Sequence, residues 1–378
     1  MSLHRINRYI CSKSIKYMAK KQEDRTIVLD NGTVAKATFP VVVSASRSTD
    51  IPAFYSDWFF HRLNKGYSAW TNPFNGVKSY VSYEDTKFIV FWSKNPRPIL
   101  SHIDDLKKKG IACYIQYTLN DYEQERLEKA VRPITERIET FKLLVEKLGK
   151  GAVIWRFDPL ILTETIGVDD LLRKIEFIGD SLYGYTEKLV FSFADIASYR
   201  KVKANLEKNN IRYKEWDESS MMEFASKLAE LNKKWGYELA TCGEKIDIEQ
   251  FGIKHNHCVD DKLIVRLGYR SPELMKFLNA EILQPHVVQQ DLFAMEESPA
   301  IPQDAILLDN GEYAIINKSN KDKGQREFCG CMKSKDIGEY NTCPHLCEYC
   351  YANTSKETAV SNWQQHKKSP FAETITDK

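Results

Sequence analysis

The sequence predicts an α/β fold, specifically a full or partial β/α barrel, and three observations support this prediction. Short runs rich in β-branched and aromatic residues alternate with stretches of helical periodicity. The chain has 378 residues, of which 43 % are hydrophobic, so it can bury a large core. Polar residues follow most of the strand-like runs, as they do at the carboxyl rim of a barrel. An open doubly wound sheet is the alternative.

The predicted elements follow one another in a regular order. Seven runs are expected to be strands: residues 41–46, 67–71, 88–92, 112–119, 152–157, 188–193 and 237–242. Helices are expected between most of them: residues 99–109, 121–148 (two helices, split at Pro133), 168–178, 197–208 and 221–234. Strands that alternate with helices favour a parallel sheet with helical crossovers, and seven such units suit a barrel better than a short open sheet.

We expect four segments along the chain. Residues 1–40 form an N-terminal extension with a hairpin that turns at Asn31-Gly32, and residues 41–283 form the barrel. Residues 284–328 form a proline-containing linker and a second hairpin. Residues 329–378 form a cysteine-rich region that completes the barrel.

Charge and hydropathy limit the partners and the cellular location that the sequence predicts. The 54 basic and 52 acidic residues give a net charge of +2, which predicts neither a nucleic-acid coat nor a membrane-surface protein. No apolar run approaches the roughly 18 residues that span a bilayer, and the N-terminus lacks the features of a secretory signal. We therefore expect a cytoplasmic protein whose nine cysteines are metal ligands or catalytic thiols rather than disulfides.

Three cysteines close to the C-terminus carry the strongest chemical signal. Cys343, Cys347 and Cys350 are spaced Cys-x3-Cys-x2-Cys within TCPHLCEYCYAN. Three thiolates on a tight loop can hold a [4Fe–4S] cluster and leave one of its four irons without a protein ligand. A structural zinc site would need a fourth ligand, for which His345, Cys329 or Cys331 is available. The iron–sulfur interpretation is favoured because no second Cys-x2-Cys pair is present.

The remaining cysteines divide by context. Cys113 lies in an apolar strand and is expected to be a small buried side chain, and Cys11 lies in the basic extension. Four others could close a second [4Fe–4S] cluster or an all-thiolate zinc site: Cys242, Cys258, Cys329 and Cys331. His257 could replace one of them as a ligand, whereas His255 is expected to be an ordinary loop residue.

The cysteine spacing, with Tyr349 just before the last thiol, resembles the radical S-adenosylmethionine (SAM) superfamily. Four stretches also resemble an uncharacterised bacterial family with a C-terminal cluster of this type: 44–55, 91–98, 155–162 and 329–353. In the superfamily the cysteine loop follows the first barrel strand, so the resemblance implies a circular permutation. Residues 337–342 would then be the displaced strand, and 355–367 the helix after the loop. Ser44-Ala45-Ser46-Arg47 stands where the superfamily often has a Gly-Gly-Glu-like stretch.

The resemblance implies an enzyme that reductively cleaves SAM and starts radical chemistry on an unknown substrate. Rim residues are the candidates for the rest of the site. Those expected to be catalytic are Arg47, Asp50, Arg156 and Asp158, and those expected to bind the cofactor are Ser46, Asn72, Asn95, Gln116 and Tyr349. Any single one could instead cap a helix. A ferredoxin or flavodoxin is the expected reductant, and similarity to the spore photoproduct lyase branch hints at a nucleic-acid substrate.

Two other interpretations remain open at this point. One is a zinc-stabilised barrel that binds nucleic acid or a protein, with Trp92, Trp155, Tyr349 and Tyr351 stacking on bases. The other is a barrel hydrolase that uses Arg156 and Asp158, which would leave the cysteines unexplained.

Overall fold

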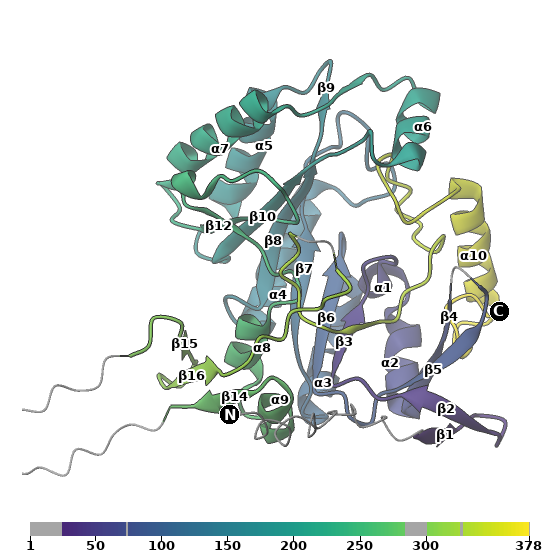
Figure 1. The fold of residues 1–378 in the computed structure, drawn as a ribbon. Helices are drawn as coiled ribbons and strands as arrows, with labels where there is room; N and C mark the ends of the chain where they lie inside the picture. The colour runs from purple at the N-terminus through teal and green to yellow at the C-terminus, as the bar shows by residue number, and fades with distance from the viewer. Residues whose placement is uncertain (1–24, 73–74, 284–300, 326–327, 378) are drawn as a thin grey trace, which may run out of the picture.

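A sheet of eight parallel strands forms the centre of the protein (Figure 1). The computed structural model describes residues 25–72, 75–283, 301–325 and 328–377. The strand order is β13-β12-β10-β8-β7-β6-β3-β17. Their bounds are β3 Val42–Ala45, β6 Phe88–Ser93, β7 Ala112–Thr118, β8 Val153–Leu160, β10 Lys188–Phe193, β12 Glu238–Thr241, β13 Ile253–His255 and β17 Lys335–Asp336. The fold is therefore α/β, as predicted, and the sheet is that of a partial β/α barrel.

Both faces of the sheet are covered, which explains why its strands read as nearly continuous apolar runs. In β6, Ile89 and Phe91 pack into the larger core with the crossover helices, whereas Phe88 and Val90 pack into a second core. The crossover helices are α1 Ile51–Phe54, α2 Ser56–Lys65, α3 Ile103–Lys108, α4 Ile134–Leu148, α5 Val168–Ser181, α6 Arg200–Lys208 and α7 Glu218–Asn232. The second core includes side chains of α8 Asp261–Gly268 and α9 Pro272–Phe277.

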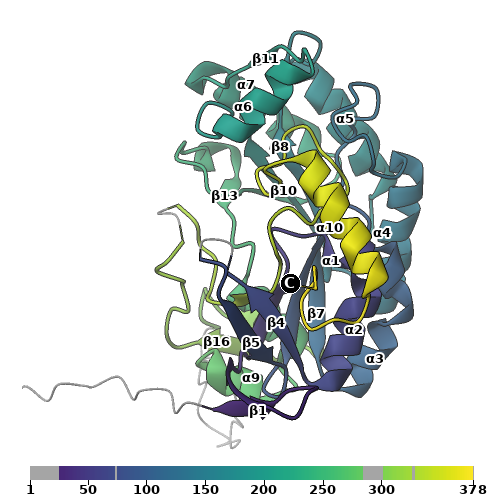
Figure 2. The same ribbon diagram turned by 90° about the vertical axis from the view of Figure 1, so that its right-hand side faces the viewer.

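The edge strand β17 joins the C-terminal region to the first strand of the sheet. Lys335 pairs with Val43 and Asp336 with Ser44, in parallel register. The Asp336 carboxylate also accepts hydrogen bonds from the Ser44 hydroxyl at 3.0 Å and the Arg47 backbone amide at 2.9 Å. Helix α10, Lys356–Lys368, lies on the side of α1 and α2 (Figure 2), where the ring of Trp363 is 5.2 Å from that of Tyr55. The strand expected at 337–342 thus lies slightly earlier, at 335–336.

Smaller sheets flank the central one. The Asn31-Gly32 hairpin is formed by β1 Thr26–Val28 and β2 Val34–Thr38, which join β5 Lys78–Ser82 and β4 Tyr67–Thr71 in a four-stranded sheet. The second predicted hairpin is formed by β15 Ile306–Leu307 and β16 Tyr313–Ile316, next to β14 Ala280–Ile282. The two-residue strands β9 Leu162–Thr163 and β11 Tyr213–Lys214 form a ribbon.

Two sequence-based assignments were wrong. Residues 67–71 do form a strand, but it pairs antiparallel with β5 and is not part of the barrel sheet. Residues 121–132 are not helical, because Arg126 has a left-handed φ of 55° and the chain turns there to bury Glu128. The short 3-10 helices η1 Arg97–Ser101 and η2 Glu249–Phe251 complete the described elements.

Some expectations fall on residues outside those described. They concern residues 1–24, with Cys11, and most of the linker at 284–303. In the described part of the chain, no helix combines the length and apolarity needed to cross a membrane.

Candidate functional site

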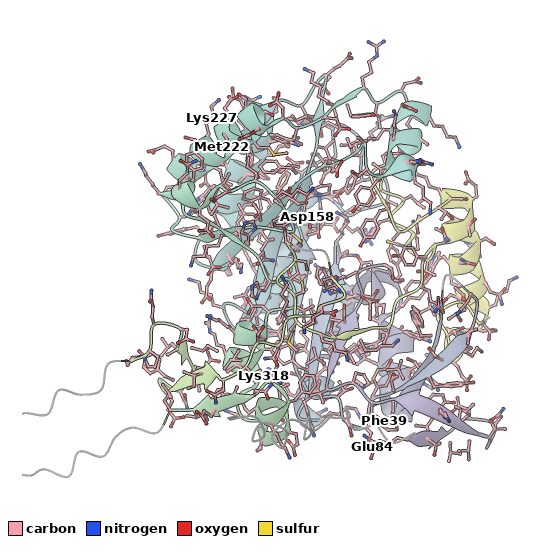
Figure 3. All side chains as sticks on the ribbon, in the orientation of Figure 1. Phe39, Glu84, Asp158, Met222, Lys227 and Lys318 are labelled. Carbon is pink, nitrogen blue, oxygen red and sulfur yellow. The ribbon has the colours of Figure 1, made fainter. Side chains whose placement is uncertain are left out.

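A cavity of about 1340 Å³ lies at the carboxyl ends of the parallel strands. It is lined by residues at or just after the ends of β3, β6, β7, β8, β10 and β12. Asp158, labelled in Figure 3, marks this end of the sheet. Seven thiols line the cavity: Cys242, Cys258, Cys329, Cys331, Cys343, Cys347 and Cys350. Both cysteine sets inferred from the sequence therefore face one common space.

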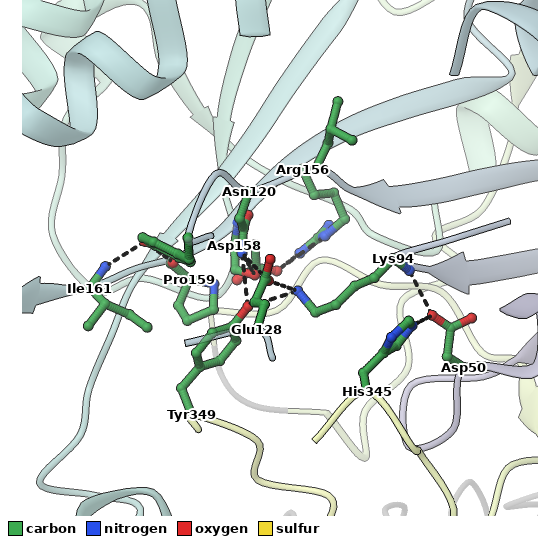
Figure 4. A network of polar contacts seen from close by, with 12 residues as sticks. Asp50, Lys94, Asn120, Glu128, Arg156, Asp158, Pro159, Ile161, His345 and Tyr349 are labelled. Atoms are coloured by element: carbon green, nitrogen blue, oxygen red, sulfur yellow. Dashed lines mark hydrogen bonds and ion pairs between the residues drawn. The ribbon is translucent and has the colours of Figure 1, made fainter. Parts of the chain in front are cut away.

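The loop with Cys343, Cys347 and Cys350 is fixed by bonds to the sheet and to α1. His345 directs Nε2 at the Asp50 carboxylate, 2.8 Å away, and this bond joins the loop to the end of β3 (Figure 4). The Tyr55 hydroxyl donates to the Thr342 carbonyl at 2.6 Å, just before the first thiol. Burial raises the pKa of all three thiols.

Asp50 uses both carboxylate oxygens to connect three parts of the protein. Oδ1 accepts from the Ala53 amide at 3.0 Å, which caps α1, and from the Ser93 hydroxyl at 2.6 Å. Oδ2 accepts from the Lys94 amide at 2.7 Å as well as from His345. The cysteine loop, the start of α1 and the end of β6 are therefore held by one buried side chain.

A buried ionic network lies behind the same loop (Figure 4). The Lys94 ammonium is 2.7 Å from the Glu128 carboxylate and 2.9 Å from the Tyr349 hydroxyl, which in turn donates to Glu128. Burial opposes the charge of both groups, but Lys94 and Arg137 hold the pKa of Glu128 below its ordinary value, and Glu128 raises that of Lys94. A permanent cation thus lies close enough to Cys347 to attract a thiolate there.

The second set of thiols is arranged as a row. The Cys242 and Cys258 sulfurs are 3.1 Å apart, and Cys331 interacts with both Cys258 and Cys329. The hydrogen bonds from Cys242 and Cys331, together with the neighbouring Arg156, lower the pKa of Cys258 well below its usual value. The hydrogen bond from Cys331 lowers the pKa of Cys329 to about 6.

Two arginines lie against Trp92 in the cavity. The guanidinium carbons of Arg47 and Arg156 are 5.2 and 5.5 Å from the centre of the Trp92 ring. Arg156 forms an ion pair with Asp158, and Asp158 also accepts a hydrogen bond from the Ser192 hydroxyl. The Nη2 atom of Arg47 is buried and has no hydrogen-bond partner among the residues that the structure describes. Arg47 thus offers a donor atom to an occupant of the cavity that carries acceptor atoms.

A family model described as a domain of unknown function, DUF1848, matches residues 42–352. This match covers most of the chain. The protein belongs to the DUF1848 family. No curated protein matches it. The match spans the strands β3 to β13, β17 and the three-cysteine loop, so the sheet and the cavity lie within the DUF1848 domain.

The DUF1848 cavity brings together most of the predicted site residues but not all. Six of the nine non-cysteine candidates line it: Ser46, Arg47, Asp50, Arg156, Asp158 and Tyr349. Asn72, Asn95 and Gln116 are not part of the lining. Asn72 follows β4 in the flanking sheet. Gln116 lies behind the second thiol set, where it donates to the Cys258 carbonyl at 2.7 Å and accepts from Arg156 at 3.1 Å.

Other sequence-based expectations for the DUF1848 chain can be located as well. Cys113 is buried in β7, as predicted, and is not part of the cavity lining. Trp155 is fully buried and donates its indole N–H to the Leu119 carbonyl, so it does not offer a face for stacking. Of the four aromatic residues considered for base stacking, Tyr351 is the one with an exposed side chain.

The sequence analysis missed Lys94 and Glu128 as parts of the site. Glu128 lies in a stretch whose composition predicts a helix, and its partners are far away in the sequence, so no local pattern marks it. Lys94 follows directly after a predicted strand in FWSKNPRP, and this position could have identified it. His345 was considered only as a metal ligand, whereas its Nε2 atom faces Asp50.

Proposed function

We propose that this DUF1848 protein is a radical SAM enzyme whose catalytic [4Fe–4S] cluster is held by Cys343, Cys347 and Cys350. One observation carries the proposal: the three thiols line a cavity at the carboxyl ends of parallel strands, on a loop that follows the edge strand β17. Parallel β/α sheets build their active sites at this edge. The strand β17 lies beside β3 at the edge of the sheet. The three-cysteine loop therefore follows an edge strand, as the cysteine loop of the superfamily follows the first barrel strand, and this supports the proposed circular permutation.

The residues around the loop fit a cluster with three protein ligands. A [4Fe–4S] cluster bound in this way has one open iron, which can bind the amino and carboxylate groups of SAM and supply the electron that cleaves it to a 5′-deoxyadenosyl radical. We assign Asp50 to positioning, since both of its oxygens are occupied by the loop and its neighbours. Lys94 offsets negative charge near Cys347.

The cavity has room for more than one ligand. Its volume of about 1340 Å³ exceeds the roughly 300–1,000 Å³ of a typical small-molecule site. We propose that Ser46 and Tyr349 border the SAM position next to the loop, and that Arg47, Arg156 and Asp158 contact the substrate further along the rim. The reductant is a ferredoxin or flavodoxin in this proposal, and the barrel with residues 329–378 forms one catalytic unit.

The test is SAM cleavage by anaerobically purified, reconstituted protein with dithionite as reductant. We expect 5′-deoxyadenosine and methionine in equal amounts, and at least a hundredfold less of both from the Cys343→Ala variant. Cys113→Ala is the matched control, because it removes a buried thiol that does not line the cavity. Undiminished 5′-deoxyadenosine from Cys343→Ala, or none from the iron-loaded wild type, would contradict the proposal.

A further inference from the structure

The second row of thiols is assembled from three separate segments of the chain. Cys242 directly follows β12, Cys258 lies between β13 and α8, and Cys329 and Cys331 come from the C-terminal region. The sulfurs of Cys242 and Cys258 are 3.1 Å apart, and Cys331 interacts with Cys258 and Cys329. Ordinary buried cysteines have no reason to converge in this way, whereas ligands of a common metal centre do.

Nitrogen donors point at these sulfurs. The Cys258 sulfur accepts from Arg156 Nη1 and Asn256 Nδ2, both at 3.2 Å, and the Cys331 sulfur accepts from the Val259 amide at 3.4 Å. Hydrogen bonds of this kind stabilise sulfur in its anionic form, the form that binds metal. They are also one of the ways in which proteins set the potential of iron–sulfur clusters.

The charges around the row favour a centre with excess negative charge. Arg156 is buried and Arg47 is partly buried, and the Cys258 thiol is among the groups that stabilise the charge of both. Asp158 pairs with Arg156, but Nη2 of Arg47 has no hydrogen-bond partner in the described part of the chain. Four thiolates around a [4Fe–4S]2+ core leave a net charge of about −2, which the Arg47 guanidinium would offset in part.

The spread of the four sulfurs can be compared with that of the ligands in a zinc site. Thiolates bound to one tetrahedral zinc at about 2.3 Å lie about 3.8 Å from one another. Within residues 25–72, 75–283, 301–325 and 328–377, one group of three ligand-type side chains has all its ligand atoms within 4.8 Å of one another, and it contains no thiol: His257, Asp260 and Asp261. No three of the four sulfurs therefore lie within 4.8 Å of one another in the described residues, and metal analysis distinguishes a cluster from zinc.

Gly330 allows the Cys329-Gly330-Cys331 turn to reach the row. A Cβ atom at this position would overlap the imidazole ring of His257. The turn thus packs directly against His257, which places this ring beside the thiols as a packing surface.

We propose that Cys242, Cys258, Cys329 and Cys331 hold a second [4Fe–4S] cluster in the wall of the same cavity. Because all four irons would have a thiolate, this cluster binds no substrate and serves to transfer electrons. The proposal concerns a different set of ligands from Cys343, Cys347 and Cys350, and it stands whether or not the first loop cleaves SAM.

The deciding experiment removes the first loop's thiols and leaves the second set intact. The Cys343→Ala/Cys347→Ala/Cys350→Ala variant is reconstituted anaerobically, followed by iron, sulfide and zinc quantification and Mössbauer spectroscopy. We expect about four irons and four sulfides per chain, against about eight of each in the wild type. No iron and sulfide, or one zinc without sulfide, in a variant with wild-type circular dichroism would overturn the proposal.

A reciprocal variant assigns the ligands. Cys258→Ala/Cys331→Ala removes the two central thiols, and we expect the iron content to fall from about eight to about four per chain. SAM cleavage activity is measured as a separate readout of the same variant. If this variant does not fold, Arg156→Gln in the triple-alanine background replaces it, with a more negative midpoint potential of the remaining cluster as the expected result. An unchanged potential would mean that Arg156 does not bond to a cluster ligand, contrary to the proposal.

Discussion

Replacing Asp50 by alanine tests the idea that one carboxylate holds the three-cysteine loop in place. The substitution removes four hydrogen bonds, from the Ala53 amide, the Ser93 hydroxyl, the Lys94 amide and the His345 ring, with distances of 2.6–3.0 Å. At about 1 kcal/mol for each bond, the free energy of unfolding should fall by about 4 kcal/mol. The side chain is buried, so water replaces these partners poorly.

The Asp50→Asn variant distinguishes the contribution of Oδ1 from that of Oδ2. It keeps an acceptor at Oδ1 for Ala53 and Ser93 but puts an amide NH2 where Lys94 and His345 now donate to Oδ2. We expect Asp50→Asn to lose about 2 kcal/mol, half the loss of the alanine variant. Both variants should bind less iron at the Cys343 loop, because His345 loses its partner.

The measurements are urea unfolding of the metal-free chain and iron bound per chain after reconstitution. Asp57→Ala is the matched control, since Asp57 is an exposed carboxylate whose contact with His102 at 3.3 Å should contribute less than about 1 kcal/mol. If Asp50→Ala unfolds within 1 kcal/mol of the wild type and binds as much iron, the loop is held by other contacts and our reasoning is wrong.

Three further predictions concern Glu128, Gly330 and His366. Glu128→Gln should lower the free energy of unfolding by about 3–5 kcal/mol in urea melts, because it leaves the Lys94 ammonium buried without its carboxylate, and adding Lys94→Met should restore part of the loss. Gly330→Ala should reduce sulfide binding by the second thiol set through overlap with His257, and His257→Ala should restore it; undiminished sulfide in Gly330→Ala alone would contradict this packing. Burial lowers the pKa of His366, so the wild type should lose stability as the pH falls below about 6.5, and the His366→Phe variant should lose less in unfolding measured from pH 7 to 5.

The parallel sheet was predictable because its strands are buried on both faces and therefore stand out as apolar runs. Residues 67–71 also contain aromatic and β-branched residues, but composition does not indicate which sheet a strand joins. Parallel neighbouring strands need a crossover of about a dozen residues, usually a helix. No helical pattern separates residues 71 and 88, and this absence indicates that residues 67–71 do not belong to the parallel sheet. The three-residue strand β13 is too short to show any periodicity.

The candidate site was predictable where chemistry is local in sequence and not where it depends on distant partners. The spacing of Cys343, Cys347 and Cys350 identifies a ligand set by itself. The second thiol set could be inferred only from the number of remaining cysteines, because its members come together only in the folded chain. Glu128 was hidden in a stretch with good helix formers. Its pairing with Lys94 and Tyr349 outweighs local propensity, so the backbone leaves the helical region at Arg126.

The pairing of β17 with β3 has a consequence for the order in which the protein is made. Seven of the eight central strands end by His255, and the residues from Asn256 through Cys350 number 95. At about 5–20 residues per second, the ribosome needs roughly 5–20 s to add them. The docking surface formed by Thr49, Asp50 and Tyr55 is therefore synthesised before the thiols that it receives. The three-cysteine loop is therefore made after most of the sheet that receives it, so these thiols are added to a prepared scaffold.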